Sequence, residues 1–311
     1  MSGPVAAVVV NFNSEVHLRG CLDSLRANGV ARIVVVDNAS TDASPTGDAP
    51  GGGLDGSEWV AAGANLGYGR AANLGAATVP GADLLVCNPD LVVSAGAVDA
   101  LRARLDAEPA WGVVGPRLDN PDSSLYPSAR AFPGLVDALG HGLLGSVAPA
   151  NRFTRRYRML DWDHDTPQPV DWVSGACFLA RREAWDEVGG FDPAYFMYME
   201  DVDLCWRLGQ AGWRVGYEPA AVVAHHQGAS TAQHPYRMLA AHHASMWRFA
   251  GRHTTGARRA CLPLVGAALA LRLGALSARH AWSSGRRARD LAGNPGPAGV
   301  AGPGRARRPL P

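Results

Sequence analysis

The stretch VAAVVVNFNSEVHLRGCLDSLRANGVARIVVVDN, residues 5–38, decides the fold class of this 311-residue chain. Its two ends, 5–10 and 32–37, are apolar runs of strand length that are rich in β-branched residues. Between them, apolar residues recur at helical spacing over 16–25, and Gly29 follows where a helix would end. A strand, a helix and a second buried strand predict a parallel sheet with helices on its faces.

The same alternation continues along the chain. Residues 83–88, DLLVCN, predict another buried strand, and the next segment predicts a helix that Ser94 opens and that ends before Pro109. Residues 171–191 predict a strand followed by a helix, and 220–226, AAVVAHH, predict a further strand. We therefore expect an α/β fold.

Four other segments differ in composition. Residues 42–57 are a Gly- and Pro-rich excursion, and 117–170 are loop-rich with an arginine cluster, NRFTRRYR. The predicted C-terminal helical region contains an apolar part, 262–276, that Arg272 interrupts and that is too short to span a bilayer. We expect a helix that lies at a membrane interface. Residues 292–311 have the composition of a disordered tail.

Charge is divided unevenly along the chain, which contains no lysine. Residues 1–250 carry 18 Arg against 27 Asp and Glu, whereas 251–311 carry 11 Arg against the single Asp290. The missing lysine excludes a P-loop NTPase. An arginine-rich end predicts contact with nucleic acid or with an anionic phospholipid surface. The acidic body and the few aromatic residues of the tail disfavour nucleic acid, so we expect an anionic membrane surface as partner.

The cysteines and the N-terminus indicate a compartment. The five cysteines are scattered without CxxC spacing, which disfavours a disulfide framework and a zinc site. The chain enters an apolar strand at Val5 without the basic region or cleavage site of a signal peptide. We expect a cytoplasmic protein that associates peripherally with the inner face of the plasma membrane.

Polar side chains follow three predicted strands, at the carboxyl ends where open parallel sheets bind ligands: Asn11 and Asn13, Asp37 and Asn38, and Asn88 and Asp90. Asn-Pro-Asp, which contains Asp90, is good turn chemistry in itself. A carboxylate here also suits Mg²⁺, which takes one or two protein carboxylates and completes its shell with substrate phosphates and water. The neighbouring polar strand ends favour a cation that is bound together with a phosphorylated substrate.

The glycine-rich stretch GANLGYGRAANLGAA, residues 63–77, permits close backbone approach and offers the amides of Asn65 and Asn73. Its spacing is not GxGxxG, so it does not support a Rossmann dinucleotide site. Such a loop by itself is more often only a turn.

The stretch FMYMEDVDLCWRLGQAGW, residues 196–213, places Glu200, Asp201 and Asp203 beside aromatic and sulfur side chains. One interpretation makes these acids the first turn of a helix, whose dipole they complement. We favour it for Asp203. The other makes an acid a general base, because the preceding YFMYM is an apolar patch that brings the acids to the wall of a pocket.

His225 and His226 close the strand 220–226. A histidine at a strand end is more often a satisfied polar residue than a ligand. One of this pair is nevertheless placed to complete the shell of a cation that Asp90 begins to bind.

Six stretches, in this order and spacing, resemble the inverting glycosyltransferases of family 2, which have the GT-A fold: VVVNFNS, VVDNASTDAS, GANLGYGRAAN, NPD, GGFDPAYFMYMEDVDLCWRLGQAGW and HHQGAST. The similarity covers about residues 5–255. Within the family, YPSAR, FMYMEDVDL and the basic C-terminus are similar to actinobacterial rhamnosyltransferases that act on lipid-linked N-acetylglucosamine. The resemblance implies a Rossmann-like, mixed, mostly parallel sheet flanked by helices, with a helical basic C-terminal extension.

The resemblance also implies a nucleotide-sugar site, in which Asp37 recognises the nucleotide. The residues that share this site with it are Asn11, Asn13, Asn38, Asn65, Gly67, Asn73, Asn88 and Asp90. Asp90 would hold a metal, Mg²⁺ or Mn²⁺, that bridges the diphosphate, and His225 matches the family's His-x-x-Gly position, with His226 as the alternative. The family often has Asp-x-Asp where this chain has Asn88, so only one carboxylate remains.

Catalytic and acceptor residues are implied in the same way. Asp201 matches the catalytic base and Glu200 its supporting neighbour. Trp172 and Gly175, in DWVSGAC, match the acceptor-binding strand.

The function implied by the resemblance is the inverting transfer of L-rhamnose from dTDP-rhamnose to a polyprenyl-diphosphate-linked N-acetylglucosamine, in cell-wall linker or polysaccharide synthesis. It divides the chain into a nucleotide-sugar-binding half, 1–110, an acceptor-binding and catalytic half of the same domain, 111–237, a helical membrane-proximal extension, 238–291, and the tail, 292–311. Two alternatives stay open. One is a transferase for another donor sugar, such as galactofuranose or glucose, and the other is a non-catalytic nucleotide- or carbohydrate-binding module.

Overall fold

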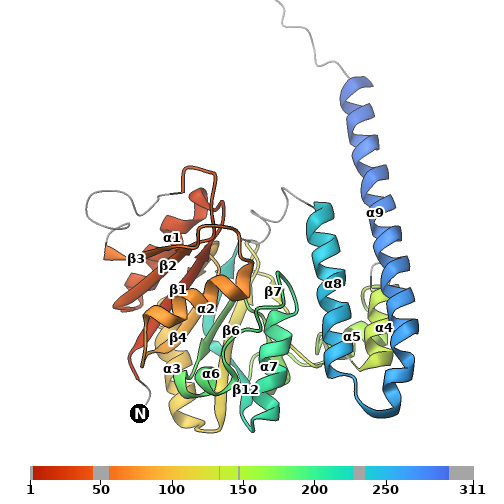
Figure 1. Cartoon of the computed structure of the whole chain (residues 1–311). Helices are drawn as coiled ribbons and strands as arrows, with labels where there is room; N and C mark the ends of the chain where they lie inside the picture. The colour runs from red at the N-terminus through yellow and green to blue at the C-terminus, as the bar shows by residue number, and fades with distance from the viewer. Residues whose placement is uncertain (1–2, 45–55, 133, 146–147, 227–234, 294–311) are drawn as a thin grey trace, which may run out of the picture.

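The computed structural model describes residues 3–44, 56–132, 134–145, 148–226 and 235–293 (Figure 1). An α/β body contains one large sheet, and two long C-terminal helices lie beside it. Most of the predicted Gly/Pro-rich excursion, 45–55, lies outside the described residues, and so does the predicted tail from residue 294 onward.

Within the described residues the strands are β1 Val5–Asn11, β2 Arg32–Asp37, β3 Glu58–Ala61, β4 Asp83–Cys87, β5 Leu91–Val93, β6 Trp111–Asp119, β7 Leu125–Tyr126, β8 Ala129–Arg130, β9 Gln168–Val170, β10 Trp172–Val173, β11 Cys177–Ala180 and β12 Arg214–His225. The main sheet has the order β3-β2-β1-β4-β11-β6-β12-β5, with β7 beside β6 and β9 beside β12. The strands β3, β2, β1 and β4 are parallel, whereas β11 and β5 run antiparallel to their neighbours. β8 and β10 form a separate antiparallel pair.

The helices are α1 Glu15–Ala27, α2 Tyr68–Thr78, α3 Ala97–Ala107, α4 Leu135–Leu144, α5 Arg152–Tyr157, α6 Arg182–Val188, α7 Glu200–Gln210, α8 Pro235–His253 and α9 Leu262–Gly293, with a 3₁₀ turn at Gly256–Cys261. A mixed sheet flanked by helices and followed by C-terminal helices confirms the predicted fold class.

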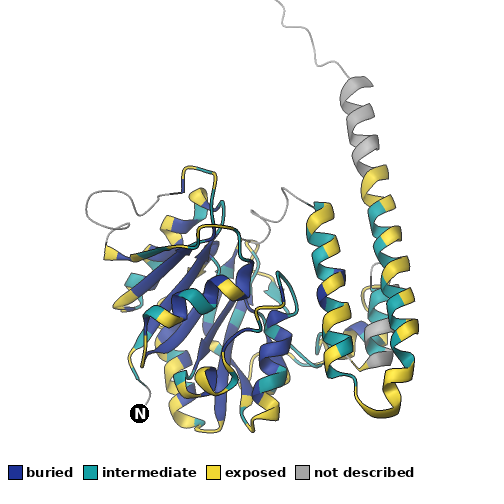
Figure 2. Ribbon diagram, in the orientation of Figure 1, coloured by how far each residue is buried: buried dark blue, intermediate teal, exposed yellow. Residues whose placement is uncertain are grey.

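Alternate residues of the central strands pack against helices on opposite faces, as the two-residue period of a strand requires. Val8 and Val36 belong to a hydrophobic cluster that also contains residues of α2, α6 and α7, whereas Val9 and Val35 belong to a second cluster that contains residues of α1 and α3. All four valines are fully buried. Figure 2 shows the contrast between this buried sheet and the exposed surfaces of α8 and α9. The hydrophobic core therefore lies on the two faces of the main sheet, and the polar residues at the strand ends are available to form a binding site.

Two predicted boundaries were wrong. The helix expected to open at Ser94 begins at Ala97, because β5 carries the chain on to Ser94, whose N–H donates to the Val222 carbonyl oxygen at 3.1 Å. The strand expected at 220–226 is the end of the longer β12, whose register shifts between Glu218 and Val222. The segment 117–170 is loop-rich as expected, with the short elements β7, β8, β9, α4 and α5 between its loops.

The expectation that the apolar C-terminal helix is too short to span a bilayer was also wrong. The helical segment Gly256–Trp282 has 27 residues and contains an 18-residue window with mean hydropathy 1.7, of which 6% is buried, so by length and composition it is long and apolar enough to cross a membrane. The segment is longer than 262–276 because it includes the 3₁₀ turn Gly256–Cys261 and the residues of α9 up to Trp282. Arg272 interrupts the apolar run but not the helix, and its Nε donates to the Gly142 carbonyl oxygen at 3.1 Å.

Candidate active site

The ends of β1 and β2 lie side by side, with Asn11 opposite Asp37. Asn11 Nδ2 donates to Asp37 Oδ1 at 3.0 Å and to Ser40 Oγ at 3.1 Å. The Ser40 N–H donates to the other Asp37 oxygen at 3.2 Å. Asn13 Oδ1 accepts from the Thr41 N–H at 2.7 Å. The structure thus brings three predicted nucleotide-binding residues together, and Asp37 remains only half-buried.

Asn38 joins the end of β2 to the glycine-rich loop, since its Nδ2 donates to Asn65 Oδ1 at 3.1 Å. Gly67 in this loop has a left-handed φ of 85°, and an added Cβ would overlap the Phe196 carbonyl oxygen. Glycine therefore lets the loop contact the segment that precedes α7. The Tyr68 N–H donates to the same Phe196 oxygen at 3.1 Å.

Asn73 lies apart from these residues. Its Nδ2 donates to the Phe191 carbonyl oxygen at 2.8 Å, and its Oδ1 accepts from the Phe191 N–H at 2.9 Å. Both ends of the amide therefore hold the loop before α7 against α2. The role of Asn73 in donor binding stays a prediction.

Asp90 and His225 face each other. Asp90 directly precedes β5, and His225 is the last residue of β12, which pairs with β5. His225 Nε2 lies 3.2 Å from Asp90 Oδ1 and 3.4 Å from Asn88 Nδ2, and Asp90 and His225 are each 8% exposed. His225 Nδ1 is a buried atom without a hydrogen-bond partner among the described residues, and the buried Asp90 Oδ1 has no partner there besides this contact with His225. His226 is exposed, and its ring stacks on His17 with centroids 5.4 Å apart. This geometry fits the choice of His225 over His226.

The pair Asp90 and His225 fits a divalent cation, because a carboxylate oxygen and an imidazole nitrogen are both suitable ligands. Across the described part of the chain, no three His, Cys, Asp or Glu side chains gather as a fuller ligand set. Two protein ligands leave most of the coordination shell to a diphosphate and water.

Asp201 lies in the first turn of α7, where the backbone holds its carboxylate. The Gly175 N–H donates to Asp201 Oδ2 at 2.9 Å, and a Cβ added to Gly175 would lie 3.2 Å from Asp201 Cβ. Burial raises the pKa of Asp201, while hydrogen bonds from the backbone of Gly175 and Val202 and the charge of Arg130 act in the opposite direction. A carboxylate with a raised pKa in a fixed position suits a general base.

Glu200 is buried directly beside Asp201. Burial, and then the charge of Asp201, raise the pKa of Glu200 to about 8. Its Oε2 has no hydrogen-bond partner among the described residues. Tyr198 and Met199 precede it with a φ of 67° each, which is uncommon for residues other than glycine. The raised pKa favours the protonated form of Glu200, which adds no second negative charge beside Asp201.

Tyr126 and Arg130, which were not among the predicted site residues, connect the two ends of this site. Arg130 Nη2 donates to the Tyr126 hydroxyl at 3.0 Å, and its guanidinium lies 5.0 Å from the Trp172 ring centroid. The Tyr126 ring meets the His225 ring edge-on, with centroids 6.4 Å apart. The available signal was YPSAR, in which an arginine follows a tyrosine by four residues.

The backbone makes a second connection between the two ends. The Asn88 N–H donates to the Ala176 carbonyl oxygen at 2.8 Å, and Ala176 follows the Gly175 that holds Asp201. β4 and β11 pair directly below this point, with Cys87 opposite Cys177. The predicted metal ligands and the predicted base therefore lie at the same edge of the sheet.

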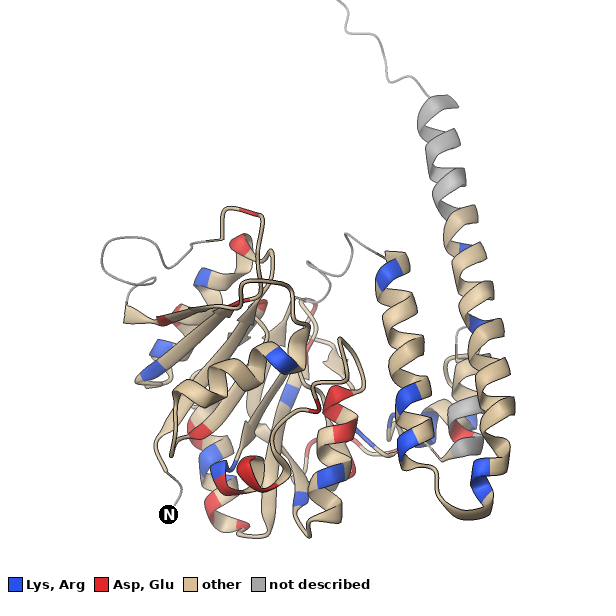
Figure 3. Ribbon diagram, viewed as in Figure 1, with Lys and Arg blue, Asp and Glu red and all other residues tan. Residues whose placement is uncertain are grey.

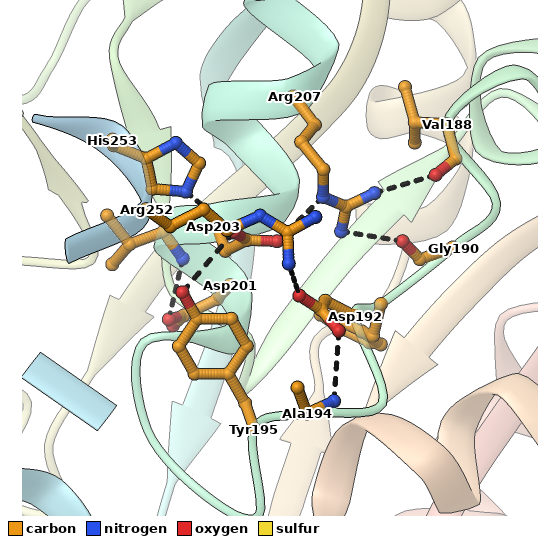
Figure 4. A network of polar contacts seen from close by, with 12 residues as sticks. Val188, Gly190, Asp192, Ala194, Tyr195, Asp201, Asp203, Arg207, Arg252 and His253 are labelled. Atoms are coloured by element: carbon orange, nitrogen blue, oxygen red, sulfur yellow. Dashed lines mark hydrogen bonds and ion pairs between the residues drawn. The ribbon is translucent and has the colours of Figure 1, made fainter. Parts of the chain in front are cut away.

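Asp203 belongs to a different network (Figure 4). It is fully buried and accepts from Arg207 Nε at 2.6 Å and from the Tyr195 hydroxyl at 3.4 Å. Arg207 also donates to the Val188 and Gly190 carbonyl oxygens, both at 2.7 Å. These contacts give Asp203 a structural role.

The amino-acid sequence is similar to those of named rhamnosyltransferases. N-acetylglucosaminyl-diphospho-decaprenol L-rhamnosyltransferase of Mycobacterium tuberculosis is 41% identical over 271 residues, which cover 82% of this chain and 86% of that protein. Rhamnosyltransferase WbbL of Escherichia coli is 28% identical over 231 residues, which cover 71% of this chain and 83% of that protein.

Solved structures share the fold at low sequence identity. The mannosyltransferase PcManGT from Pyrobaculum calidifontis, in complex with GDP-Man and Mn²⁺, has a TM-score of 0.53 at 17% identity and covers 92% of this chain and 80% of its own. GalNAc-T7 with UDP, GalNAc and Mn²⁺ has a TM-score of 0.52 at 15% identity and covers 72% of this chain and 44% of its own. Residues 3–260 match the family described as Glycosyltransferase like family 2. This chain is therefore a glycosyltransferase of family 2 with a GT-A fold.

Proposed function

We propose that the protein is an inverting glycosyltransferase that moves L-rhamnose from dTDP-rhamnose to N-acetylglucosamine on a polyprenyl diphosphate, in cell-wall or polysaccharide synthesis. The relative from Mycobacterium tuberculosis, 41% identical, is named for rhamnosyl transfer to N-acetylglucosaminyl-diphospho-decaprenol. One observation carries the chemistry. Asp201 is held by the Gly175 N–H at 2.9 Å, at the sheet edge where Asp90 and His225 also lie.

The donor side of the site comes from residues 1–110 together with His225. Asp37, with Asn11 and Asn13 beside it, would bind the nucleotide. Asp90 and His225 would hold Mg²⁺ or Mn²⁺. When bound there, a divalent cation offsets the negative charge that develops on the leaving diphosphate.

The acceptor side comes from residues 111–237, with Trp172 and Gly175 beside the base. Asp201 takes the proton of the acceptor hydroxyl while that oxygen attacks the anomeric carbon of the donor sugar. The bond to the diphosphate breaks on the opposite face of the sugar, and its electrons leave with the nucleoside diphosphate. The configuration at this carbon therefore inverts. Glu200 supports Asp201 by staying protonated beside it.

A lipid acceptor requires contact with the membrane, which we assign to the C-terminal helices, 238–291, on the cytoplasmic face. α8 has no acidic residue, and α9 exposes Leu264 and Leu271 at 70% and 76%. Figure 3 shows the arginines that these helices carry. Arginine near an anionic leaflet contributes about 1 kcal/mol per residue to binding, and apolar side chains add to it. We infer peripheral association through these surfaces.

A donor screen tests the proposal. The full-length protein is incubated with a synthetic polyprenyl-diphosphate N-acetylglucosamine and with dTDP-rhamnose, UDP-glucose or UDP-galactofuranose, and the lipid products are read by mass spectrometry. We expect one deoxyhexose to be added from dTDP-rhamnose, with strong suppression by EDTA.

Two results would contradict the proposal in different ways. Equal turnover from a UDP-hexose would show that the donor is a different sugar and would leave the mechanism in place. Binding of nucleotide sugars without any turnover would identify a non-catalytic module instead.

A further inference from the structure

Three arginines from distant parts of the chain converge beside the C-terminal helices. Arg130 ends β8, Arg158 follows α5, and Arg272 lies within α9. All three are partly buried. Burial, and then the charges of Arg158, Arg130 and Arg272, lower the pKa of His141 to about 4. The contacts agree with this: the His141 ring lies 4.9 Å from the Tyr157 ring between centroids, Arg130 lies 5.6 Å from that same Tyr157 ring, and Arg158 follows Tyr157 in the chain. Arg272 contacts Gly142, the residue after His141.

Arg272 is the single charged residue of the apolar stretch 262–276. Its Nε donates to the Gly142 carbonyl oxygen at 3.1 Å, and its Nη1 lies 3.2 Å from His243 Nε2. His243 Nδ1 lies 2.8 Å from the Leu239 carbonyl oxygen, so Nδ1 carries the proton and Nε2 accepts from Arg272. Neither partner of Arg272 is a carboxylate. Its charge is therefore held in place without being neutralised.

Arg130 and Arg158 also lack a carboxylate in direct contact. The Arg130 guanidinium lies over three aromatic rings, at 5.0 to 5.6 Å from their centroids: Tyr126, Tyr157 and Trp172. Arg158 Nε is a buried atom with no hydrogen-bond partner among the described residues. The ion pairs found in the described structure include none of these three arginines.

The charges near the arginines do not balance them. Burial, then Arg272, His243 and Arg130, lower the pKa of His242 to about 4, so this ring is neutral at physiological pH. Asp201 is the acid whose charge acts on Arg130, and the proposed mechanism already uses it. Partly buried cations without a counter-charge are costly, and an anion that binds to them relieves that cost.

We propose that Arg130, Arg158 and Arg272 bind the diphosphate of the lipid-linked acceptor. This inference rests on the proposed function, in which the acceptor sugar is attached to a polyprenyl diphosphate. A diphosphate supplies the negative charge that the cluster lacks, and guanidinium groups match the geometry of phosphate oxygens. The reacting hydroxyl of such an acceptor lies one sugar ring away from its diphosphate. Arg130 contacts Trp172, and its charge acts on Asp201. It therefore lies between the proposed base and the other two arginines, where the acceptor's diphosphate would be.

The position of Arg272 in an apolar helix suits an acceptor of this kind. Leu264 and Leu271 on the same helix are exposed at 70% and 76%. The polyprenyl chain of the acceptor would run along this exposed apolar surface into the bilayer. A ligand with a charged head and an apolar tail explains why an arginine with no carboxylate partner is placed here.

The test uses the full-length protein in detergent with two acceptors. One is a short prenyl-diphosphate N-acetylglucosamine, and the other is an alkyl N-acetylglucosamine glycoside without a diphosphate. Arg272→Gln and Arg158→Gln are each expected to raise the KM for the diphosphate acceptor by about tenfold or more, since each removes charge-assisted hydrogen bonds. The KM for the donor and the rate with the alkyl glycoside should stay as in the wild type. Arg272→Lys keeps the charge and should recover part of the loss.

The phosphates of membrane lipids have the same charge chemistry as the acceptor's diphosphate. The variant Arg279→Gln distinguishes binding of the acceptor from binding of the membrane. Arg279 is exposed on α9, seven residues after Arg272, and its substitution changes the net charge equally. It is expected to leave the KM for the diphosphate acceptor unchanged. The inference is overturned if Arg279→Gln raises this KM as much as Arg272→Gln does. It is also overturned if Arg272→Gln impairs both acceptors equally.

Direct binding separates this inference from the proposed function. A short prenyl diphosphate is titrated calorimetrically into the wild type and Arg272→Gln in EDTA, which requires no turnover. Binding that Arg272→Gln weakens by about tenfold supports the arginine cluster, whether or not rhamnose is transferred. If the binding is weakened and no rhamnose is transferred, only the proposed function is contradicted. Equal binding by wild type and variant, together with rhamnosyl transfer, overturns the cluster alone.

Discussion

His253 Nε2 lies 2.7 Å from Asp203 Oδ1, and this contact joins the end of α8 to the helix that carries Asp201 (Figure 4). Asp203 is fully buried, and the His253 side chain is 9% exposed. The neighbouring Arg252 pairs with Asp192 in the loop before α7. The helix we assign to the membrane side is therefore attached directly to the helix of the proposed base.

Asp203→Asn is expected to lower the free energy of unfolding by about 3 kcal/mol, because it leaves Arg207 and His253 beside a buried group without its charge. Urea denaturation at neutral pH measures the change. The matched control is Asp186→Asn, which breaks the Asp186–Arg182 pair on α6, where the Asp186 side chain is 55% exposed. That control should cost less than about 1 kcal/mol. Equal costs for the two variants would contradict the buried-pair argument.

Glu200 should make stability depend on pH. The pKa of its carboxyl is 4.5 ordinarily and about 8 in the folded protein. Between these values the folded state keeps a proton that the unfolded state has lost. The free energy of unfolding therefore falls as pH rises, by at most about 1.4 kcal/mol per pH unit.

Glu200→Gln removes this titration, so the variant should match the wild type below about pH 4.5 and be more stable at about pH 8. Urea denaturation at several pH values follows the difference. Glu183→Gln, at an exposed position of α6, should retain the wild-type slope. If Glu200→Gln also retained it, Glu200 would not be protonated in the folded protein.

Asp201→Asn is expected to lower kcat by about 10²–10⁴-fold, because the amide can still accept the Gly175 N–H but cannot take a proton. Donor binding, measured by calorimetry with the nucleoside diphosphate, should stay unchanged. A variant that kept near wild-type turnover would show that another group removes the proton.

Asp90→Asn should raise the Mn²⁺ concentration required for half-maximal binding of the nucleoside diphosphate by about tenfold or more, since it removes the carboxylate of the proposed pair. His225→Ala should act in the same direction. Fluorescence titration of a labelled nucleotide with Mn²⁺ measures both effects without turnover. His226→Ala is the control, because His226 is exposed and stacks on His17. A shift as large in this control would remove the basis for choosing His225.

The sequence alone was sufficient to predict the β1-α1-β2 unit and β4, because strands that are buried on both faces have continuous apolar sequences. It was also sufficient to place Asn11, Asp37 and Asp90 at one edge, since parallel strands end on the same side of a sheet. The short strands β5, β7 and β8 were missed. They are too brief to show a period, and they are set by pairing with β12, β6 and β10.

Only the tertiary structure decided what each side chain contacts. Asp201 and Asp203 lie in the same turn of α7, yet one meets Gly175 and the other meets His253, because different segments pack on the two sides of that helix. Arg130 and Arg272 are likewise far apart in the sequence, yet the charges of both act on His141 in the fold. Contacts between distant segments leave no period in a sequence, because they depend on how helices and strands pack together after they have formed.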